Sequence, residues 1–170
     1  MSVFFISDPH FGHESLCRSI RKMSAEESDE LIIGNWNKIV HKKDVIFVLG
    51  DFTMENPRLI PSYVKRLNGQ IRIIGGNHDD RRCCREFSEL GIPVLGCLEY
   101  KGFIVTHIPI REEEVAYYRA NIHGHIHATK NSYLPKDKYY NVNCEFHNYT
   151  PVDFEEIKNF ILSAIKPTSL

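Results

Sequence analysis

The sequence lacks the features that mark membrane, secreted and polyanion-binding proteins. No apolar run is long enough to cross a membrane, and the first one, residues 3–6, is too short for a signal peptide. The five cysteines are an odd number and include no Cys-x-x-Cys pair, which favours free thiols over a disulfide framework. The formal net charge of -1 gives no general attraction to nucleic acid or anionic lipid. We therefore expect a cytoplasmic protein with no membrane partner.

Linkers, internal repeats and low-complexity segments are also absent from the sequence. Glycine and proline are scattered through the 170 residues rather than clustered, so no linker divides the chain. Hydrophobic residues make up 42% of the chain, which is typical of a protein that buries a core. The sequence thus predicts a single domain over residues 1–170.

Short apolar runs alternate with helical patterns in the first half of the chain and follow one another in the second. We predict strands at residues 3–6, 45–50, 71–74, 94–95, 103–106 and 122–123, and a terminal pair of strands at 139–143 and 147–152. We predict helices at residues 25–40, 56–68, 80–90 and 154–165, the first of which begins with a Ser24-x-x-Glu27 capping box. This order favours an α/β sandwich, with one mixed sheet or two packed sheets flanked by helices.

Residue types that bind metals follow five of the predicted strands. They lie in the segments Asp8-Pro9-His10, Gly50-Asp51, Gly76-Asn77-His78-Asp79, Thr106-His107 and Gly124-His125-Ile126-His127. Ligands of α/β sheets gather at the carboxyl ends of the strands, so one sheet edge would collect all five segments. Such an edge would hold two metal ions, and hydrolytic phosphate chemistry becomes the leading hypothesis.

Each of these segments also has an ordinary structural explanation when it is considered alone. An acidic residue two positions from a histidine is usually a pair of polar loop residues, and Gly-Asn is a common turn. Asp51 is a stronger candidate, because a carboxylate that ends a buried strand is costly to desolvate unless it is paired or bound to metal. We expect the other histidines to be bystanders, namely His13, His41, His123 and His147.

In order and identity, the five segments resemble the metallophosphoesterase (calcineurin-like phosphoesterase) superfamily. Its pattern is D-x-H, G-D, G-N-H-[DE], a later H, and G-H-x-H, and the resemblance spans residues 3 to about 152. Residues 6–13 look most like the small, cap-less bacterial and phage members. The resemblance implies a calcineurin-like sandwich of two packed mixed β-sheets flanked by helices.

The resemblance also implies two sets of metal ligands that share Asp51. The first set is Asp8, His10, Asp51 and His127, and the second is Asp51, Asn77, His107 and His125. Asp51 would bridge the two ions, with one carboxylate oxygen directed to each. Imidazole and oxygen donors suit Mn, which we favour, or Fe, Zn, Ni or Co, rather than Ca or Mg.

The activity implied is hydrolysis of a phosphodiester or phosphomonoester by a metal-bridging hydroxide, with the diester slightly favoured. His78 would stabilise charge or protonate the leaving oxygen, and Asp79 would orient it. The alternative is a catalytically silent metal-binding scaffold or protein-interaction module of the same fold.

The substrate classes left open are phosphorylated small molecules, nucleotides and phosphoproteins. The acidic run Glu112–Glu114 disfavours a nucleic acid polymer, because it would repel a polyanion if it faced the site. Arg81, Arg82 and Arg111 are either phosphate contacts or solvated surface charges, and the second is the usual outcome.

Overall fold

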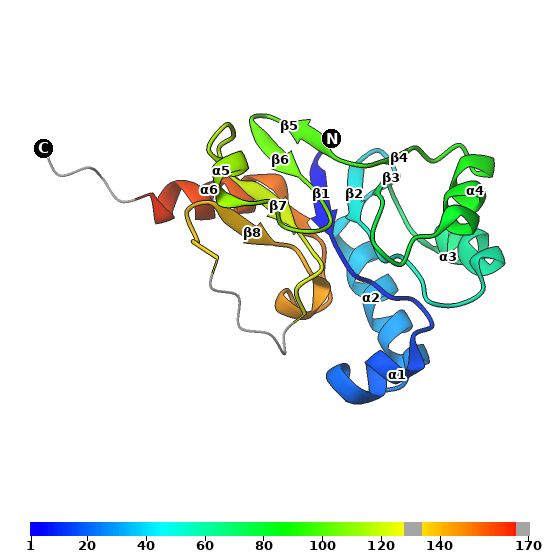
Figure 1. The fold of residues 1–170 in the computed structure, drawn as a ribbon. Helices are drawn as coiled ribbons and strands as arrows, with labels where there is room; N and C mark the ends of the chain where they lie inside the picture. The colour runs from blue at the N-terminus through cyan, green and yellow to red at the C-terminus, as the bar shows by residue number, and fades with distance from the viewer. Residues whose placement is uncertain (128–133, 166–170) are drawn as a thin grey trace, which may run out of the picture.

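The computed structural model describes residues 1–127 and 134–165, and in these residues the strands form two sheets (Figure 1). The first, ordered β4-β3-β2-β1-β9, contains β1 (Val3–Ile6), β2 (Val45–Leu49), β3 (Gln70–Ile74), β4 (Val94–Leu95) and β9 (Val152–Asp153). The second, ordered β5-β6-β7-β8, contains β5 (Leu98–Tyr100), β6 (Phe103–Val105), β7 (Asn121–His123) and β8 (Tyr139–Asn141). Strands β1–β4 are parallel and β9 is antiparallel, whereas β6–β8 are parallel and β5 is antiparallel. The expected pair of mixed sheets is therefore confirmed.

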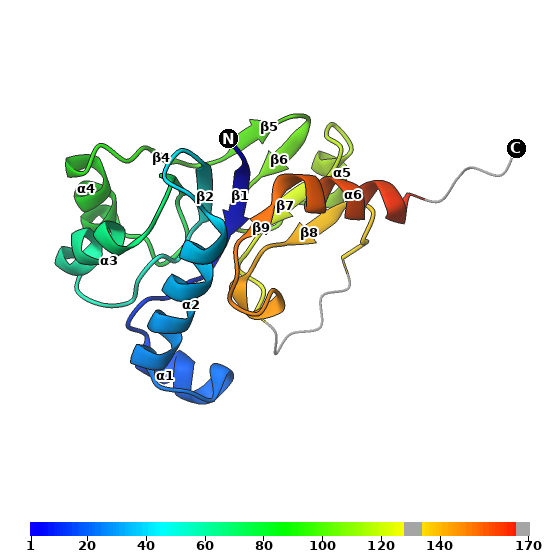
Figure 2. The same cartoon turned by 180° about the vertical axis from the view of Figure 1, so that it is seen from behind.

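Helices flank both sheets, with α2 beside the first sheet and α6 beside β7 and β8 (Figure 2). The helices are α1 (Glu14–Leu16, continued by a π-helix at Cys17–Arg21), α2 (Ala25–Ile39), α3 (Ile60–Arg66), α4 (Arg81–Glu89), α5 (Glu112–Val115) and α6 (Phe154–Ala164). Short 3₁₀ turns occupy Pro57–Leu59 and Cys144–Phe146. None of the helices in the described part of the chain has the length and apolar character needed to span a membrane.

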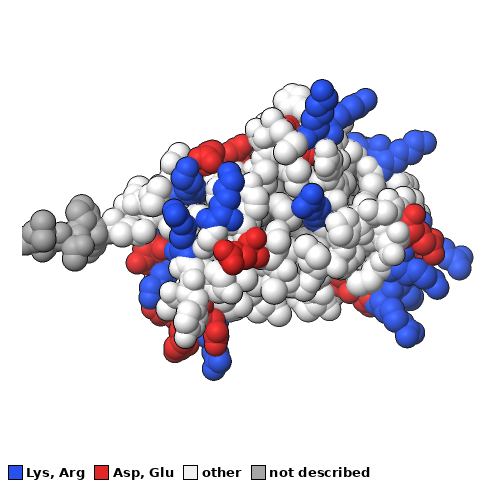
Figure 3. Space-filling view, turned by 90° about the horizontal axis from the view of Figure 1, so that it is seen from above, with Lys and Arg blue, Asp and Glu red and all other residues white. Residues whose placement is uncertain are grey.

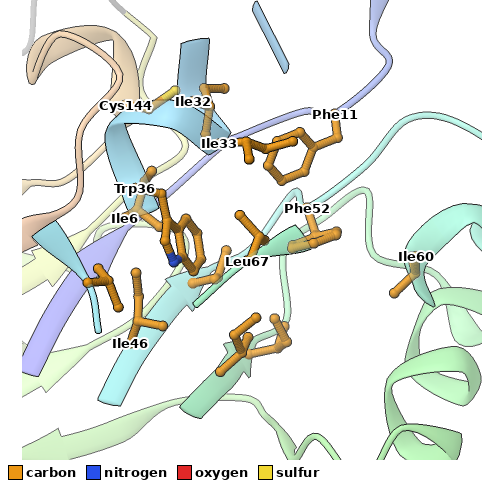
Figure 4. Close-up of a cluster of buried hydrophobic side chains, with 14 of the residues drawn as sticks. Ile6, Phe11, Ile32, Ile33, Trp36, Ile46, Phe52, Ile60, Leu67 and Cys144 are labelled. Carbon is orange, nitrogen blue, oxygen red and sulfur yellow. The ribbon is translucent and has the colours of Figure 1, made fainter. Parts of the chain in front are cut away.

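Two buried clusters of side chains form the core, one on each face of the first sheet. Side chains of β1 and β2 alternate between them: Ile46 and Val48 face helices α2, α3 and α4, whereas Phe47 and Leu49 face the second sheet and α6. Figure 4 shows the helix-side cluster, where Trp36 of α2 lies against Ile6 and Ile46. The continuous apolar run of β2 is thus explained by burial on both faces.

The predicted capping box at the start of α2 is present. The Ser24 hydroxyl accepts from the Glu27 N–H at 3.1 Å, and the Glu27 carboxylate accepts from the Ser24 N–H at 2.7 Å. The predicted helix at 56–68 is instead divided into a 3₁₀ turn and α3. Pro61 lies in the first turn of α3, a position where its missing N–H breaks no helical hydrogen bond.

The predicted terminal pair of strands is wrong. β8 pairs with β7 in the second sheet, while β9 pairs with β1 in the first. Between them the 3₁₀ turn and the left-handed residues Asn148 and Tyr149, with φ of 50° and 59°, carry the chain from one sheet to the other. The patterns also failed to indicate β5, α1 and α5, which are each only three or four residues long.

His123 is a buried histidine at the end of β7. Its Nδ1 donates to the Gly124 carbonyl at 2.9 Å, and its ring lies edge-on to Tyr139. Burial lowers the pKa of His123 to about 4, although the hydrogen bond to Gly124 acts in the opposite direction. The unfolded chain therefore takes up a proton near pH 6.5, which the folded chain does not do until near pH 4. Stability from the neutral form is complete above pH 6.5 and is lost as the pH falls towards 4.

We expect His123→Gln to reduce the pH dependence of stability. Between pH 7 and pH 5 the free energy of unfolding of the metal-free protein should fall by about 2 kcal/mol less in the variant than in the parent. Urea denaturation at the two pH values measures this difference, and contributions from other histidines cancel in the comparison. Equal pH dependence in both proteins would contradict the interpretation.

Candidate metal centre

The loops that follow β1 and β2 run side by side beyond the strands. The His10 N–H donates to the Asp51 carbonyl and the Phe11 N–H donates to the Phe52 carbonyl, both at 3.0 Å. Phe11 and Phe52 are buried, with ring centroids 5.1 Å apart, in the helix-side cluster (Figure 4). In each loop, therefore, a polar candidate ligand at the end of the sheet is followed directly by an aromatic residue that packs in the core.

Two glycines allow the neighbouring loops to approach this edge closely. A Cβ on Gly76 would lie 2.3 Å from the Asp51 Oδ1 atom, and a Cβ on Gly124 would lie 1.7 Å from the Ser7 Oγ atom. Both contacts are far shorter than any side chain tolerates. The absence of a side chain at Gly76 thus makes room for the Asp51 carboxylate.

Four of the predicted metal ligands have left-handed backbone conformations. The φ angles are 56° at Asp8, 48° at His10, 54° at Asp51 and 66° at His125. Such conformations cost a non-glycine residue of order 1–3 kcal/mol and cluster at functional sites. Here they occur just beyond the ends of β1, β2 and β7, where the chain leaves the strand conformation.

The structure brings the predicted aspartates and histidines together in two groups. Asp8, His10 and His127 form one group, and Asp51, His107 and His125 form the other, with the candidate ligand atoms of each group within 4.8 Å of one another. In the first group the Asp8 Oδ1 atom is 3.7 Å from His10 Nε2 and 3.8 Å from His127 Nε2. Asn77 joins the second group, with its Oδ1 atom 2.9 Å from His107 Nε2.

Asp51 lies between the two groups. Its Oδ2 atom is 3.6 Å from His10 Nε2 and 3.5 Å from His107 Nε2, whereas Oδ1 accepts from the backbone N–H of His78 at 2.9 Å. The expected arrangement of one oxygen directed to each ion is thus corrected. Oδ2 lies close to a histidine nitrogen of each group, while Oδ1 accepts the His78 amide.

The hydrogen-bonding state of the histidines fits a pair of metal ions. His107 Nδ1 donates to the Leu49 carbonyl at 2.7 Å and His127 Nδ1 donates to Glu145 at 2.9 Å, which leaves the Nε2 lone pair of each ring towards the centre. Asp8 Oδ1 and both His10 ring nitrogens are buried and have no hydrogen-bond partner among the described residues. Buried polar atoms are rarely left in this state, and a cation would satisfy Asp8 Oδ1 and the inward-facing ring nitrogens.

Burial shapes the electrostatics of the first group. Burial, together with the charges of His127 and Arg21, lowers the pKa of His10 to about 2, so its ring stays neutral and able to ligate. Burial raises the pKa of Asp8, although a hydrogen bond from Ser7 opposes the rise. A bound cation would favour the ionised Asp8 carboxylate, so metal binding and loss of the proton are coupled.

Arg21 and Glu145 support the first group, and the sequence patterns did not indicate either of them. The Arg21 guanidinium is buried and donates to the carbonyls of Asp8 and Pro9 at 2.8 and 2.9 Å. It also pairs with Glu145 at 3.3 Å, and the same Glu145 oxygen holds His127. Arg21 ends the unpredicted π-helix and Glu145 lies in a 3₁₀ turn, so no strand-end motif marked them.

Asp79 has a different role from the one predicted. Its carboxylate accepts the backbone N–H groups of Asp51 at 2.8 Å, Phe52 at 3.1 Å and Gly76 at 2.9 Å. It thereby ties the loop after β3 to the loop after β2, rather than orienting the His78 ring. The His78 side chain is exposed, and its ring centroid lies 5.8 Å from that of His10.

The remaining candidates lie outside the two groups. His41 is on the surface beside Asp44, and His147 donates to the Asn141 carbonyl. His13 lies at the edge of the site, with its ring 5.3 Å from His10. Arg82 and Arg111 follow the surface interpretation, because Arg82 pairs with Asp80 and Arg111 with Glu114, and Arg81 is exposed. Figure 3 shows Lys and Arg side chains projecting from the end of the molecule formed by α3 and α4.

Comparison with known proteins agrees with the fold. The chain is 31% identical to the uncharacterized protein MJ1445 of Methanocaldococcus jannaschii, over 94% of this chain and 90% of that protein. It is also 31% identical to the Gene 66 protein of Mycobacterium phage L5, over 46% of this chain and 40% of the phage protein. The protein of unknown function AQ665 from Aquifex aeolicus superposes with a TM-score of 0.75 and 25% identity, over 94% and 99% of the chains. Pseudomonas putida nuclease MPE shares the fold, with a TM-score of 0.51 and 20% identity, over 74% and 61% of the chains.

Each of the two groups of side chains could hold a metal ion, as in a dinuclear metallohydrolase. The family model for calcineurin-like phosphoesterases matches residues 1–161, and the chain belongs to this family. Family and site together support a metal-dependent phosphoesterase.

We expect Glu145→Ala to weaken metal binding by about 10–100-fold, because His127 loses the acceptor that orients its ring. Burial lowers the pKa of His127, but the hydrogen bond and charge of Glu145 outweigh it and raise this pKa above 6.5. Metal must displace that proton, so affinity for Mn²⁺ in the parent should fall as the pH drops through the raised pKa. In Glu145→Gln the fall should begin at a lower pH.

Calorimetric titration with Mn²⁺ from pH 5 to pH 8 measures both effects. Glu155→Ala is the matched control, because it removes an exposed glutamate that pairs with Lys158 on the surface of α6. Equal affinity and equal pH dependence in Glu145→Ala and Glu155→Ala would contradict the role of Glu145.

Proposed function

We propose that this protein hydrolyses a phosphodiester at a dinuclear metal centre, with His78 as the general acid. The observation that carries the proposal is the position of the Asp51 Oδ2 atom, within 3.6 Å of a histidine nitrogen from each ligand group. Asp8, His10, Asp51 and His127 would hold one ion, and Asp51, Asn77, His107 and His125 the other. When bound, the ions would supply Lewis acidity that activates water and holds the phosphoryl oxygens. Mn²⁺ is the metal we favour.

His78 is suited to meet the leaving oxygen from the solvent side of the centre. Its backbone is fixed by the hydrogen bond to Asp51, while its ring extends into solvent near His10. In its protonated form the imidazole can donate a proton to the oxygen that leaves the phosphorus. Asp79 contributes indirectly, since it fixes the two loops that carry Asp51 and His78.

The exposure of the site favours a diester over a monoester. Asn77 and His78 are both exposed, so the edge of the centre is open to solvent. A phosphodiester has two organic substituents that must both extend away from the phosphorus, and an open edge accommodates them. The natural substrate we propose is a small diester or nucleotide ester rather than a nucleic acid polymer. Cytoplasmic location remains part of the proposal.

We expect Asp51→Asn to abolish hydrolysis of bis-p-nitrophenyl phosphate and to remove metal. The amide presents one oxygen and no charge where two ions would share a carboxylate, so metal content should fall as well as activity. Elemental analysis after dialysis and a rate assay with added Mn²⁺ test this. A chelator-stripped parent that retained full activity would overturn the metal-dependent function.

We expect His78→Ala to retain metal but to lose activity in a way that depends on the leaving group. With diphenyl phosphate, whose phenolate is a basic leaving group, the rate should fall by about 10²–10⁴-fold. With bis-p-nitrophenyl phosphate the loss should be much smaller, because p-nitrophenolate leaves without a proton. Equal losses on both esters would argue against His78 as the acid, and inactivity of the parent across monoesters and diesters would argue for a silent scaffold.

A further inference from the structure

A cavity of about 310 Å³ opens beside the second group of candidate ligands. Asn77 and His107 form the wall nearest the centre. The remaining walls come from the loops after β3, β4 and β6, and consist of Gly75, Gly76, Gly96, Thr106 and Ile108. If a phosphoryl group were bound at the centre, one of its substituents could therefore extend directly into the cavity.

Apart from His107, whose Nε2 atom is directed to Asp51 of the metal centre, the lining of this cavity contains no acidic or basic side chain. The Thr106 hydroxyl donates to the Ile108 carbonyl at 2.7 Å, so its proton is already used. Ile108 is a large apolar side chain with 51% of its surface exposed, directly after His107. A charged group placed here would lose hydration without gaining a partner, whereas an uncharged ring would cover exposed apolar surface.

Two glycines line the cavity although their backbone conformation does not require glycine. Neither Gly75 nor Gly96 has a positive φ. A Cβ on Gly75 would make only ordinary contacts at 3.8 Å and beyond, and a Cβ on Gly96 would meet no atom within 4 Å. Side chains would therefore fit at both positions, and their absence leaves flat peptide surfaces and free space next to the centre.

We propose that this cavity binds an uncharged planar ring of the substrate, such as the nucleobase of a nucleotide ester. The volume is at the lower end of the range for ligand sites, about 300–1,000 Å³, which suits one ring system rather than an oligomer. The inference rests on the proposed function, because the phosphoryl group must bind at the metal centre for its substituent to reach the cavity. It narrows the substrate classes to esters with a neutral ring close to the phosphorus.

The test compares three ligands that share a phosphate: thymidine 5′-monophosphate, deoxyribose 5-phosphate and inorganic phosphate. Affinities for the Mn²⁺-loaded protein are measured by calorimetry and as competitive inhibition of bis-p-nitrophenyl phosphate hydrolysis. In the parent, the thymidine nucleotide should bind about tenfold more tightly than the sugar phosphate, which lacks the nucleobase. Gly96→Leu adds a large side chain to the wall of the cavity, so it should remove this preference and leave affinity for inorganic phosphate unchanged.

Gly34→Leu is the matched control for the substitution. Gly34 is exposed on α2, and a Cβ there also meets no atom within 4 Å, so the same change is made far from the cavity. It should leave all three affinities unchanged. Ile108→Ser is a second variant, which removes apolar surface instead of adding a side chain, and it keeps the test valid if Gly96→Leu folds poorly. It should weaken binding of the thymidine nucleotide but not of the other two ligands.

The outcomes separate this inference from the proposed function. If inorganic phosphate binds and the diester is hydrolysed, but the nucleotide binds no better than the sugar phosphate, the cavity proposal is overturned and the phosphodiesterase stands. A nucleotide preference that survives both Gly96→Leu and Ile108→Ser also overturns it. If the parent neither binds phosphate nor hydrolyses any ester, the proposed function itself fails.

Discussion

The structure depends on holding strained backbone in place at the edge of its sheets. Asp8, His10, Asp51 and His125 all have left-handed conformations, and each costs of order 1–3 kcal/mol. Such conformations persist only where contacts with the rest of the protein outweigh this local cost. Two charged side chains, the buried Arg21 and the half-buried Asp79, provide that support by hydrogen bonding to the backbone of these loops.

Aromatic side chains next to the candidate ligands connect the site to the hydrophobic core. Phe11 and Phe52 directly follow candidate ligands and pack in the helix-side cluster, where Phe11 also stacks on Tyr63 and Phe52 contacts Phe87. A ligand cannot shift without moving an aromatic ring out of a close-packed layer. The geometry of the centre is therefore maintained by hydrophobic packing on one side and by charge-assisted hydrogen bonds on the other.

His78 and the cavity beside Asn77 differ in chemistry. On the proposed function, the exposed His78 ring would supply the proton donor, whereas the cavity offers glycine peptide surfaces and the apolar Ile108 side chain. A diester bound between them would place its leaving oxygen and one substituent in different environments. Selectivity would then come from the substituent, while the metal centre and His78 would act on the phosphoryl group common to all such esters.

Much of the fold was predictable because local patterns determine it. The capping box of α2, the Asp153 cap of α6 and the doubly buried β2 follow from side chains a few positions apart. The partners of β8 and β9 were not predictable, because pairing depends on left-handed residues at 148 and 149 that resemble an ordinary loop in sequence. The shortest elements carry too few residues to show a period.

The sequence by itself indicated which residues could ligate metal, because each follows a strand end. The expectation that one sheet edge collects all five segments was wrong, because the strands belong to two sheets whose packing brings their ends together. Only the tertiary structure decided that one Asp51 oxygen faces both groups, that Asp79 binds backbone amides, and that Arg21 and Glu145 support the centre. Arg21 and Glu145 are 124 positions apart, and their pairing follows from the packing of the π-helix beside a 3₁₀ turn. Candidate ligands can be recognised from their residue type and their position after a strand. The residues that hold the ligands in place cannot, because their contacts exist only after the chain has folded.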